Sequence, residues 1–211
     1  MFALLLAYIQ LVVFKVLYFI RDHDKYLIVK SAAFAHLPHP NMKLESPECG
    51  LPGGVLLDHH TYLDGAKGGK FPELRWNTPP AGDVKEFVLI CEDPDVPIPF
   101  MVFVHGLFFA IPSTCFVAYH DDIEENPNVE GRVTFAGWKY VPNILGSSYV
   151  GARPPYGHGY HRYIFTIVAL SEPLGLPHPD KASVASVKWA MEGKVIGWGQ
   201  WVGQFKRHLP Q

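Results

Sequence analysis

Three short clusters hold the side chains of this sequence that could do chemistry. In the first, Asp93 and Asp95 flank a proline directly after the apolar run FVLIC. Pro94 restricts the local backbone, so the two carboxylates point in set directions. A carboxylate at the end of a buried strand needs a cation or several N–H donors close by. Taken alone, this cluster is also typical of an ordinary acidic turn.

The second and third clusters supply imidazoles and a phenol. His105 lies inside the apolar run MVFVHGLFFAIP, where a lone histidine is more often a satisfied core residue than a ligand contact. The third cluster is GARPPYGHGYHRY, whose paired prolines and glycines predict a shaped loop with backbone N–H groups that could face an anion. On the strand that follows, His161 and Tyr163 would share one face and Arg162 the other. The alternative is a cross-strand polar patch beside an ordinary turn.

Several short β-prone runs must position these clusters. The clearest are EFVLICED, MVFVHGLFFAIP and YHRYIFTIVAL, each bounded by turn residues, and GGVLLD and FPELRWN add weaker ones. Four or more such runs without intervening helical patterns predict a mainly β fold, an antiparallel sandwich over residues 22–211. Residues 182–207 allow helix interrupted by glycines, which predicts one or two short C-terminal helices packed on the sandwich.

Residues 1–21 are predicted to form a separate apolar N-terminal helix. The first 20 residues read MFALLLAYIQLVVFKVLYFI, and a helix of that length spans roughly 30 Å, the thickness of bilayer hydrocarbon. No basic segment or small-residue cleavage site precedes Arg21, which argues against a cleaved signal peptide. We favour a membrane anchor, with membrane contact through residues 1–20, over a helix packed on the domain or on a partner subunit.

The charges that follow this helix predict its orientation. Arg21, Lys25 and Lys30 come after the apolar segment, and only the amino terminus precedes it. The positive-inside rule then places the folded domain on the cytoplasmic side of a membrane. The alternative location is cytoplasmic and soluble.

Composition excludes several function classes. The net charge is −2 and there is no long basic run, so no nucleic-acid partner is expected. The three cysteines are widely spaced and form no Cys-x-x-Cys pair, which argues against a disulfide framework and a structural zinc site. His158 and His161 are three residues apart, a spacing that suits a metal only on a helix or tight turn. We expect no metal and no cofactor, and no motif indicates a hydrolase or a redox enzyme.

The three clusters, in this order and spacing, resemble the phosphatidylethanolamine-binding protein family, also called the Raf kinase inhibitor protein family. The motifs are D-P-D-x-P, V-H, and G-x-x-P-P-x-G with H-R-Y, and the resemblance spans about residues 50–207. It implies a β-sandwich with a central antiparallel sheet, a smaller second sheet and a pocket for phosphate, phosphoethanolamine, acetate or similar anions. The pocket residues that it implies are Asp93, His105, Gly151, Pro154, Pro155, His161 and Tyr163.

Physical chemistry agrees with such a pocket. Two imidazoles and a phenol could donate to ligand oxygens, while Asp93 orients or charges a histidine. Arg162 is expected to pair with Asp95 or Asp93 beneath the pocket in a structural ion pair. The sequence also departs from bacterial members that it resembles, because Gly106 stands where they commonly carry a bulky aromatic residue. This glycine predicts extra space beside the pocket, which would suit an apolar ligand.

Two functions remain close competitors. The first, slightly favoured, is a module that binds a small anionic or lipid-like ligand and acts on an unknown protein partner. The second is a cofactor-free isomerase or cyclase, because fungal members of the family are recruited to natural-product biosynthesis. There His105 or His161 would move a proton, with Asp93 setting its basicity, during cyclisation, isomerisation or epimerisation of a hydrophobic intermediate. A third possibility is a tethered domain whose pocket is vestigial.

Overall fold

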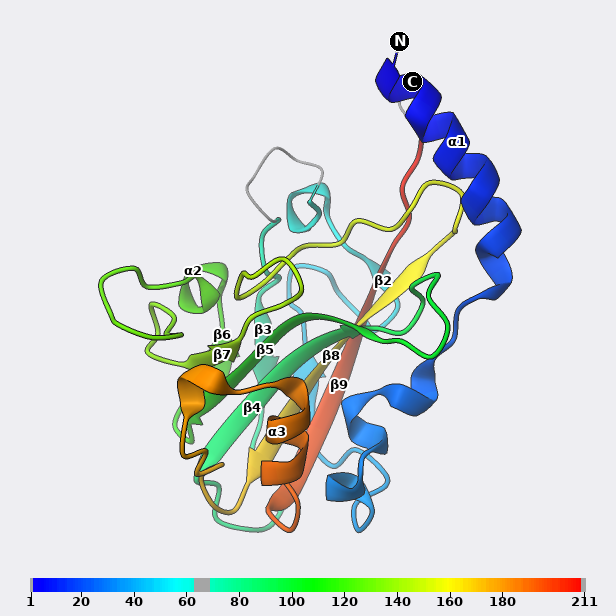
Figure 1. Cartoon of the computed structure of the whole chain (residues 1–211). Helices are drawn as coiled ribbons and strands as arrows, with labels where there is room; N and C mark the ends of the chain where they lie inside the picture. The colour runs from blue at the N-terminus through cyan, green and yellow to red at the C-terminus, as the bar shows by residue number, and fades with distance from the viewer. Residues whose placement is uncertain (1, 63–68, 210–211) are drawn as a thin grey trace.

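The chain forms a β-sandwich with helices at its periphery, as a computed structural model describes for residues 2–62 and 69–209 (Figure 1). The described helices and strands are α1 (Phe2–Val16), β1 (Leu44–Glu45), β2 (Gly54–Val55), β3 (Leu74–Trp76), β4 (Glu86–Asp93), β5 (Phe103–Pro112), β6 (Val117–Ala118), α2 (His120–Ile123), β7 (Lys139–Val141), β8 (His161–Leu170), α3 (Val184–Ala190) and β9 (Val195–Phe205). The main sheet has the order β2-β9-β8-β4-β5-β7, and the smaller sheet has the order β1-β3-β6. Among the strands of the described residues, β2 and β9 alone pair in parallel, so the predicted mainly antiparallel fold is confirmed.

Strand β4 shows why the main sheet forms where it does. All of its residues are buried, as the apolar run EFVLICED predicts. Phe87 and Leu89 point into the core beneath the smaller sheet, while Val88 and Ile90 point into the core beneath α3. Because successive strand residues alternate between faces, a strand covered on both sides is apolar at every interior position.

The C-terminal segment is helical only in part. Helix α3 begins after Ser183, whose hydroxyl accepts the Ser186 backbone N–H. The prediction of helix beyond it was wrong, because residues 195–205 form the long strand β9. A Cβ at Gly197 would lie 2.6 Å from Pro79 Cβ, and one at Gly199 would lie 2.5 Å from the Met42 carbonyl oxygen. These glycines therefore allow another segment to cross the strand closely, rather than interrupting a helix.

The segment after α1 covers the same face of the main sheet as α3 (Figure 1). It forms short 3₁₀ turns at Asp24–Tyr26, Ile28–Lys30 and Ala32–Phe34. Ile28 and Phe34 are buried against this face, and both carboxylate oxygens of Glu92 accept the Ile28 backbone N–H, at 2.9 and 3.1 Å. Burial, opposed by this hydrogen bond, raises the pKa of Glu92 to about 7.

Glu92 should make stability depend on pH. The folded protein binds this proton more tightly than the unfolded chain, whose carboxyl has a pKa of 4.5. Its contribution to the free energy of unfolding is therefore complete below pH 4.5 and is lost as pH rises to about 7. The loss amounts to roughly 3 kcal/mol. Chemical denaturation at pH 5 and pH 8 should show this fall in wild type but not in Glu92→Gln. If Glu92→Gln kept the wild-type pH dependence, Glu92 would not be the group responsible. The control is Glu172→Gln, at an exposed position, which should behave as wild type does.

Helix α1 lies at the edge of the molecule and continues as a 3₁₀ turn, Leu17–Phe19 (Figure 1). Its inner side approaches the loop before β8, where a Cβ at Gly157 would lie 2.5 Å from the Leu11 carbonyl oxygen. Many of its large apolar side chains are exposed: Leu4, Leu5, Leu6, Tyr8, Ile9, Val12, Val13 and Val16. Within residues 2–62 and 69–209, no helix is long and apolar enough to cross a membrane. The prediction that residues 1–20 form a membrane-spanning anchor is therefore not supported.

Candidate functional site

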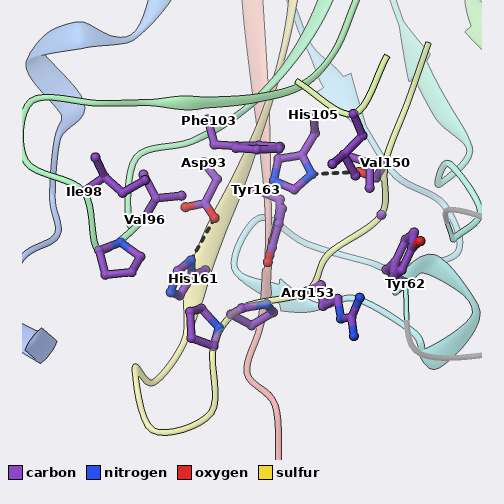
Figure 2. A pocket seen from close by; sticks show the side chains of 15 residues that line it. Tyr62, Asp93, Val96, Ile98, Phe103, His105, Val150, Arg153, His161 and Tyr163 are labelled. Atoms are coloured by element: carbon purple, nitrogen blue, oxygen red, sulfur yellow. Dashed lines mark hydrogen bonds and ion pairs between the residues drawn. The ribbon is translucent and has the colours of Figure 1, made fainter. Parts of the chain in front are cut away.

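The three clusters meet at one end of the main sheet. Strands β8, β4 and β5 are antiparallel neighbours, so the end of β4 lies beside the starts of β5 and β8. A cavity of about 470 Å³ opens there, and Figure 2 shows side chains from all three strands around it. Its lining includes every residue that the sequence assigned to the pocket: Asp93, His105, Gly151, Pro154, Pro155, His161 and Tyr163.

The rest of the lining is mostly apolar. The residues that sequence analysis missed are Tyr62, Val96, Pro97, Ile98, Leu145, Val150 and Arg153. Val96, Pro97 and Arg153 lie inside the recognised motifs and could have been included, whereas Tyr62 and Leu145 belong to no motif. Gly106 is absent from the lining, and a Cβ there would lie 2.9 Å from Phe108 Cε2. The predicted extra space beside the pocket is therefore filled by the Phe108 ring.

His105 is held as a neutral imidazole. Its Nδ1 lies 2.7 Å from the carbonyl oxygen of Val150, so Nδ1 carries the proton and donates (Figure 2). The backbone of the same two residues is also joined, by a hydrogen bond from Val150 N–H to the His105 carbonyl at 3.0 Å. Burial lowers the pKa of His105 despite the nearby Asp93 carboxylate. Its Nε2 therefore keeps a lone pair, and this atom makes no hydrogen bond among the described residues.

Asp93 and His161 belong to a chain of hydrogen bonds that ends at α1. His161 Nδ1 lies 2.8 Å from Asp93 Oδ2, and its Nε2 lies 2.8 Å from His158 Nδ1. His158 Nε2 lies 3.1 Å from the Leu17 carbonyl oxygen. A carbonyl can only accept, so His158 donates from Nε2. Burial and His161 lower the pKa of His158, which keeps its Nδ1 unprotonated as an acceptor.

These hydrogen bonds determine how many protons Asp93 and His161 hold between them. His161 must donate from Nε2 to His158, and one further proton lies between its Nδ1 and Asp93. The Asp93–His161 pair therefore carries no net charge. Asp93 Oδ1 also accepts the Asp95 backbone N–H at 2.7 Å. His161 lines the cavity, but neither of its ring nitrogens is free to bind a ligand while His158 holds it.

Tyr163 and Arg153 supply the donors that remain. Tyr163 is buried, and burial, with the Asp93 carboxylate second, raises its pKa well above the usual value. Its hydroxyl stays protonated and makes no hydrogen bond of ordinary geometry with the described residues. The exposed Arg153 stacks over the Tyr62 ring, with 4.9 Å between its guanidinium carbon and the ring centre. The guanidinium at the mouth can therefore donate to a ligand oxygen, whereas the buried phenol beside the Arg153 backbone must first turn towards the cavity.

Beneath the pocket, Arg162 and Asp95 form an ion pair. Arg162 Nε and Nη2 lie 2.9 and 2.7 Å from the two carboxylate oxygens of Asp95, which is fully buried. Arg162 also contacts Asp24 and Asp22 in the segment after α1. Although burial opposes it, Arg162 holds the pKa of Asp95 below its usual value. The guanidinium thus joins β8 to the turn after β4 and to the N-terminal segment.

Comparison with known proteins gives consistent matches. The sequence profile described as phosphatidylethanolamine-binding protein matches residues 48–206. A phomoidride biosynthesis cluster protein B from a fungal species is 39% identical over 191 residues, which cover 88% of each chain. The protein of the same name from Talaromyces stipitatus is 37% identical and covers 92% of this chain and 79% of its own. Among solved structures, E. coli YbcL superposes with a TM-score of 0.65 at 23% identity, over 80% of this chain and 99% of YbcL. At that identity the match is evidence for the fold alone.

Proposed function

The chain belongs to the phosphatidylethanolamine-binding protein family, and we propose that its pocket binds a hydrophobic, carbonyl-bearing intermediate of natural-product biosynthesis and moves a proton on it. The reaction class is cyclisation, isomerisation or epimerisation without a cofactor. The observation that carries the proposal is the state of His105, a neutral imidazole whose unbonded Nε2 belongs to a residue lining the cavity. A base that is ready to accept a proton is what removal of a C–H proton requires.

The other polar groups favour proton transfer over capture of a highly charged anion. Asp93 and His161 neutralise one another, and their polar atoms are engaged in hydrogen bonds. A phosphate dianion would find one phenol inside the cavity, and would face the lone pair of a neutral His105. A carbonyl oxygen needs only one good donor, which Tyr163 can supply once its buried hydroxyl turns towards the cavity.

The proposed step conserves every atom. His105 Nε2 takes a proton from carbon next to the substrate carbonyl and becomes an imidazolium. The electron pair of the broken C–H bond moves onto the carbonyl oxygen, and the Tyr163 hydroxyl stabilises the resulting enolate. The imidazolium then returns the proton to another carbon or another face, which gives an isomer. If the enolate carbon instead attacks a second carbonyl carbon, or a carbon of a conjugated double bond, in the same intermediate, the π electrons of that bond move onto its far atom. That atom takes the proton from the imidazolium, and the product is a ring of unchanged mass.

Two further features support a hydrophobic substrate. Apolar side chains, among them Val96, Ile98 and Phe103, line the cavity and could hold an apolar chain in a reactive conformation. Two fungal relatives carry a name that places them in a biosynthesis cluster. Those relatives share more than a third of their aligned residues with this chain, so a related pathway role is the natural proposal.

The test begins with a strain from which the gene has been deleted. Because isomerisation and cyclisation conserve mass, its extract should accumulate a compound that purified protein converts to an isomer of identical mass. In D₂O the product should carry deuterium at the carbon that gained the proton. Failure of the purified protein to convert any accumulated compound would remove the catalytic proposal.

The competing function, an anion-binding module, predicts a different pattern. Inorganic phosphate or phosphoethanolamine would then raise the melting temperature by mass action, with no change in any metabolite. This candidate draws on Arg153 at the mouth and on the binding role named for the family. Thermal shift with these two compounds therefore separates binding alone from chemistry.

A further inference from the structure

We propose that Glu48, His59 and His60 form a binding site for a divalent transition-metal cation, with zinc as the best-suited ion. The site lies outside the pocket, and it does not depend on the proposed reaction. Sequence analysis did not predict it, because a glutamate and an adjacent histidine pair eleven positions later match none of the common zinc-ligand spacings.

The three side chains already converge. Their candidate ligand atoms all lie within 4.8 Å of one another. Glu48 Oε1 lies 3.5 Å from His60 Nε2, and Glu48 Oε2 lies 3.8 Å from His59 Nε2. Zinc bound about 2.0–2.1 Å from each atom would bring neighbouring ligand atoms to roughly 3.3 Å, so no pair of ligand atoms needs to approach by more than about 1.5 Å.

His60 supplies an independent sign that this cluster can hold a cation. The residue is only 1% exposed, and its Nε2 is buried without a hydrogen-bond partner among the described residues. Its Nδ1 lies 3.1 Å from the Lys70 carbonyl, which requires Nδ1 to be the donor. The other ring nitrogen, Nε2, faces the Glu48 carboxylate, where a cation could bridge the two side chains.

The surroundings also supply the outer hydrogen bonds that metal ligands typically have. The Lys70 carbonyl fixes the His60 tautomer, and the Glu73 backbone N–H donates to Glu48 Oε1. Two imidazoles and one carboxylate, with Glu48 exposed and His59 half-buried, leave an open fourth position for water.

The site would also stabilise one wall of the cavity. His59 and His60 lie in the 3₁₀ turn Asp58–His60, and Tyr62, which lines the cavity, comes two residues after His60. The backbone N–H of Tyr62 donates to the Ala152 carbonyl at 3.0 Å, next to the Gly151–Pro155 wall. A cation held by the turn would therefore restrain Tyr62 as well.

Isothermal titration of the chelator-treated full-length protein with ZnCl₂ tests the site. Wild type should bind one zinc per chain, and Co²⁺ in its place should give the visible absorption of a low-symmetry N/O site. His59→Ala and Glu48→Gln should each weaken zinc binding by at least about tenfold, the scale on which even outer-shell partners act. These two side chains are not buried, so both variants should fold, which unfolding curves will verify. The exposed His178→Ala is the matched control and should bind as wild type does.

Two results would overturn the inference. One is the absence of zinc binding by the wild-type protein. The other is zinc binding that neither His59→Ala nor Glu48→Gln changes, which would place the ion on other residues.

Discussion

Replacing His105 with asparagine is expected to lower turnover of the pocket's substrate by about 10²- to 10⁴-fold, the usual contribution of a positioned general base. Asparagine keeps an N–H donor near the position of Nδ1, so the hydrogen bond to the Val150 carbonyl can persist. It has no basic atom in place of Nε2. The loss should therefore appear in kcat while substrate binding changes little, and single-turnover kinetics would separate the two.

The pH dependence of kcat/KM gives a second test of His105. If His105 had only a structural role, its replacement would not change this dependence. The base must be unprotonated, and burial lowers the pKa of His105 from its ordinary 6.5. As pH is lowered past 6.5, wild-type kcat/KM should therefore remain constant at first. It should decrease only when the pH reaches the lowered pKa of His105. The residual activity of His105→Asn should lack that fall. Turnover by His105→Asn within threefold of wild type, with unchanged stability, would rule out His105 as the base.

Replacing Arg162 with methionine is expected to lower the free energy of unfolding by about 3–5 kcal/mol, because it leaves the buried charge of Asp95 without its main partner. Asp95 is fully buried, and Arg162 donates to both of its carboxylate oxygens. The loss should lie towards the lower end, since Arg21 Nη2 remains 3.7 Å from Asp95 Oδ2. For a chain of this length, the melting temperature should fall by roughly 10 °C.

The double variant Arg162→Met/Asp95→Asn should recover part of that loss, since the stranded charge is gone. Arg75→Met is the matched control, because Arg75 forms an exposed ion pair with Glu73 and should cost less than about 1 kcal/mol.

The pH dependence of the Arg162 effect has a definite sign. In wild type the pKa of Asp95 is depressed, so its stabilising contribution is present above the unfolded value of 3.8 and is lost as pH falls through the folded value. Without Arg162, burial should raise the pKa of Asp95 instead. The stability gap between wild type and Arg162→Met should therefore narrow on acidification, and a gap independent of pH would contradict the pairing.

The convergence of the pocket residues was predicted from the resemblance of their motifs to those of a known family. The structure supplies the physical reason: Asp93 ends one strand, while His105 and His161 stand near the starts of its two neighbours. In an antiparallel sheet the end of one strand lies beside the start of the next, which brings these side chains to a shared edge. The pattern could not show that His161 is engaged on both sides, because His158 depends on a carbonyl at Leu17, 141 residues away.

Other features escaped prediction for identifiable reasons. The glycines of β9 suggested interruptions in a helix, yet their real role is to let Met42 and Pro79 approach the strand. Gly106 suggested open space, yet the Phe108 ring fills it. In both cases a glycine indicates that another part of the chain packs closely against it, but the sequence does not identify that part. The apolar composition of residues 1–20 was equally ambiguous, because it fits a lipid-spanning helix or a shorter helix at the edge of a domain.

The carbonyl of Leu17 has a practical implication for anyone who produces this protein. Expression of a shortened chain without the apolar first twenty residues would remove the Leu17 carbonyl oxygen, which accepts the hydrogen bond from His158. The imidazole next to the pocket could then rotate or take up water, and His161 would lose its outer restraint. An inactive trimmed preparation would thus report a disturbed histidine pair, even though every residue lining the cavity had been kept.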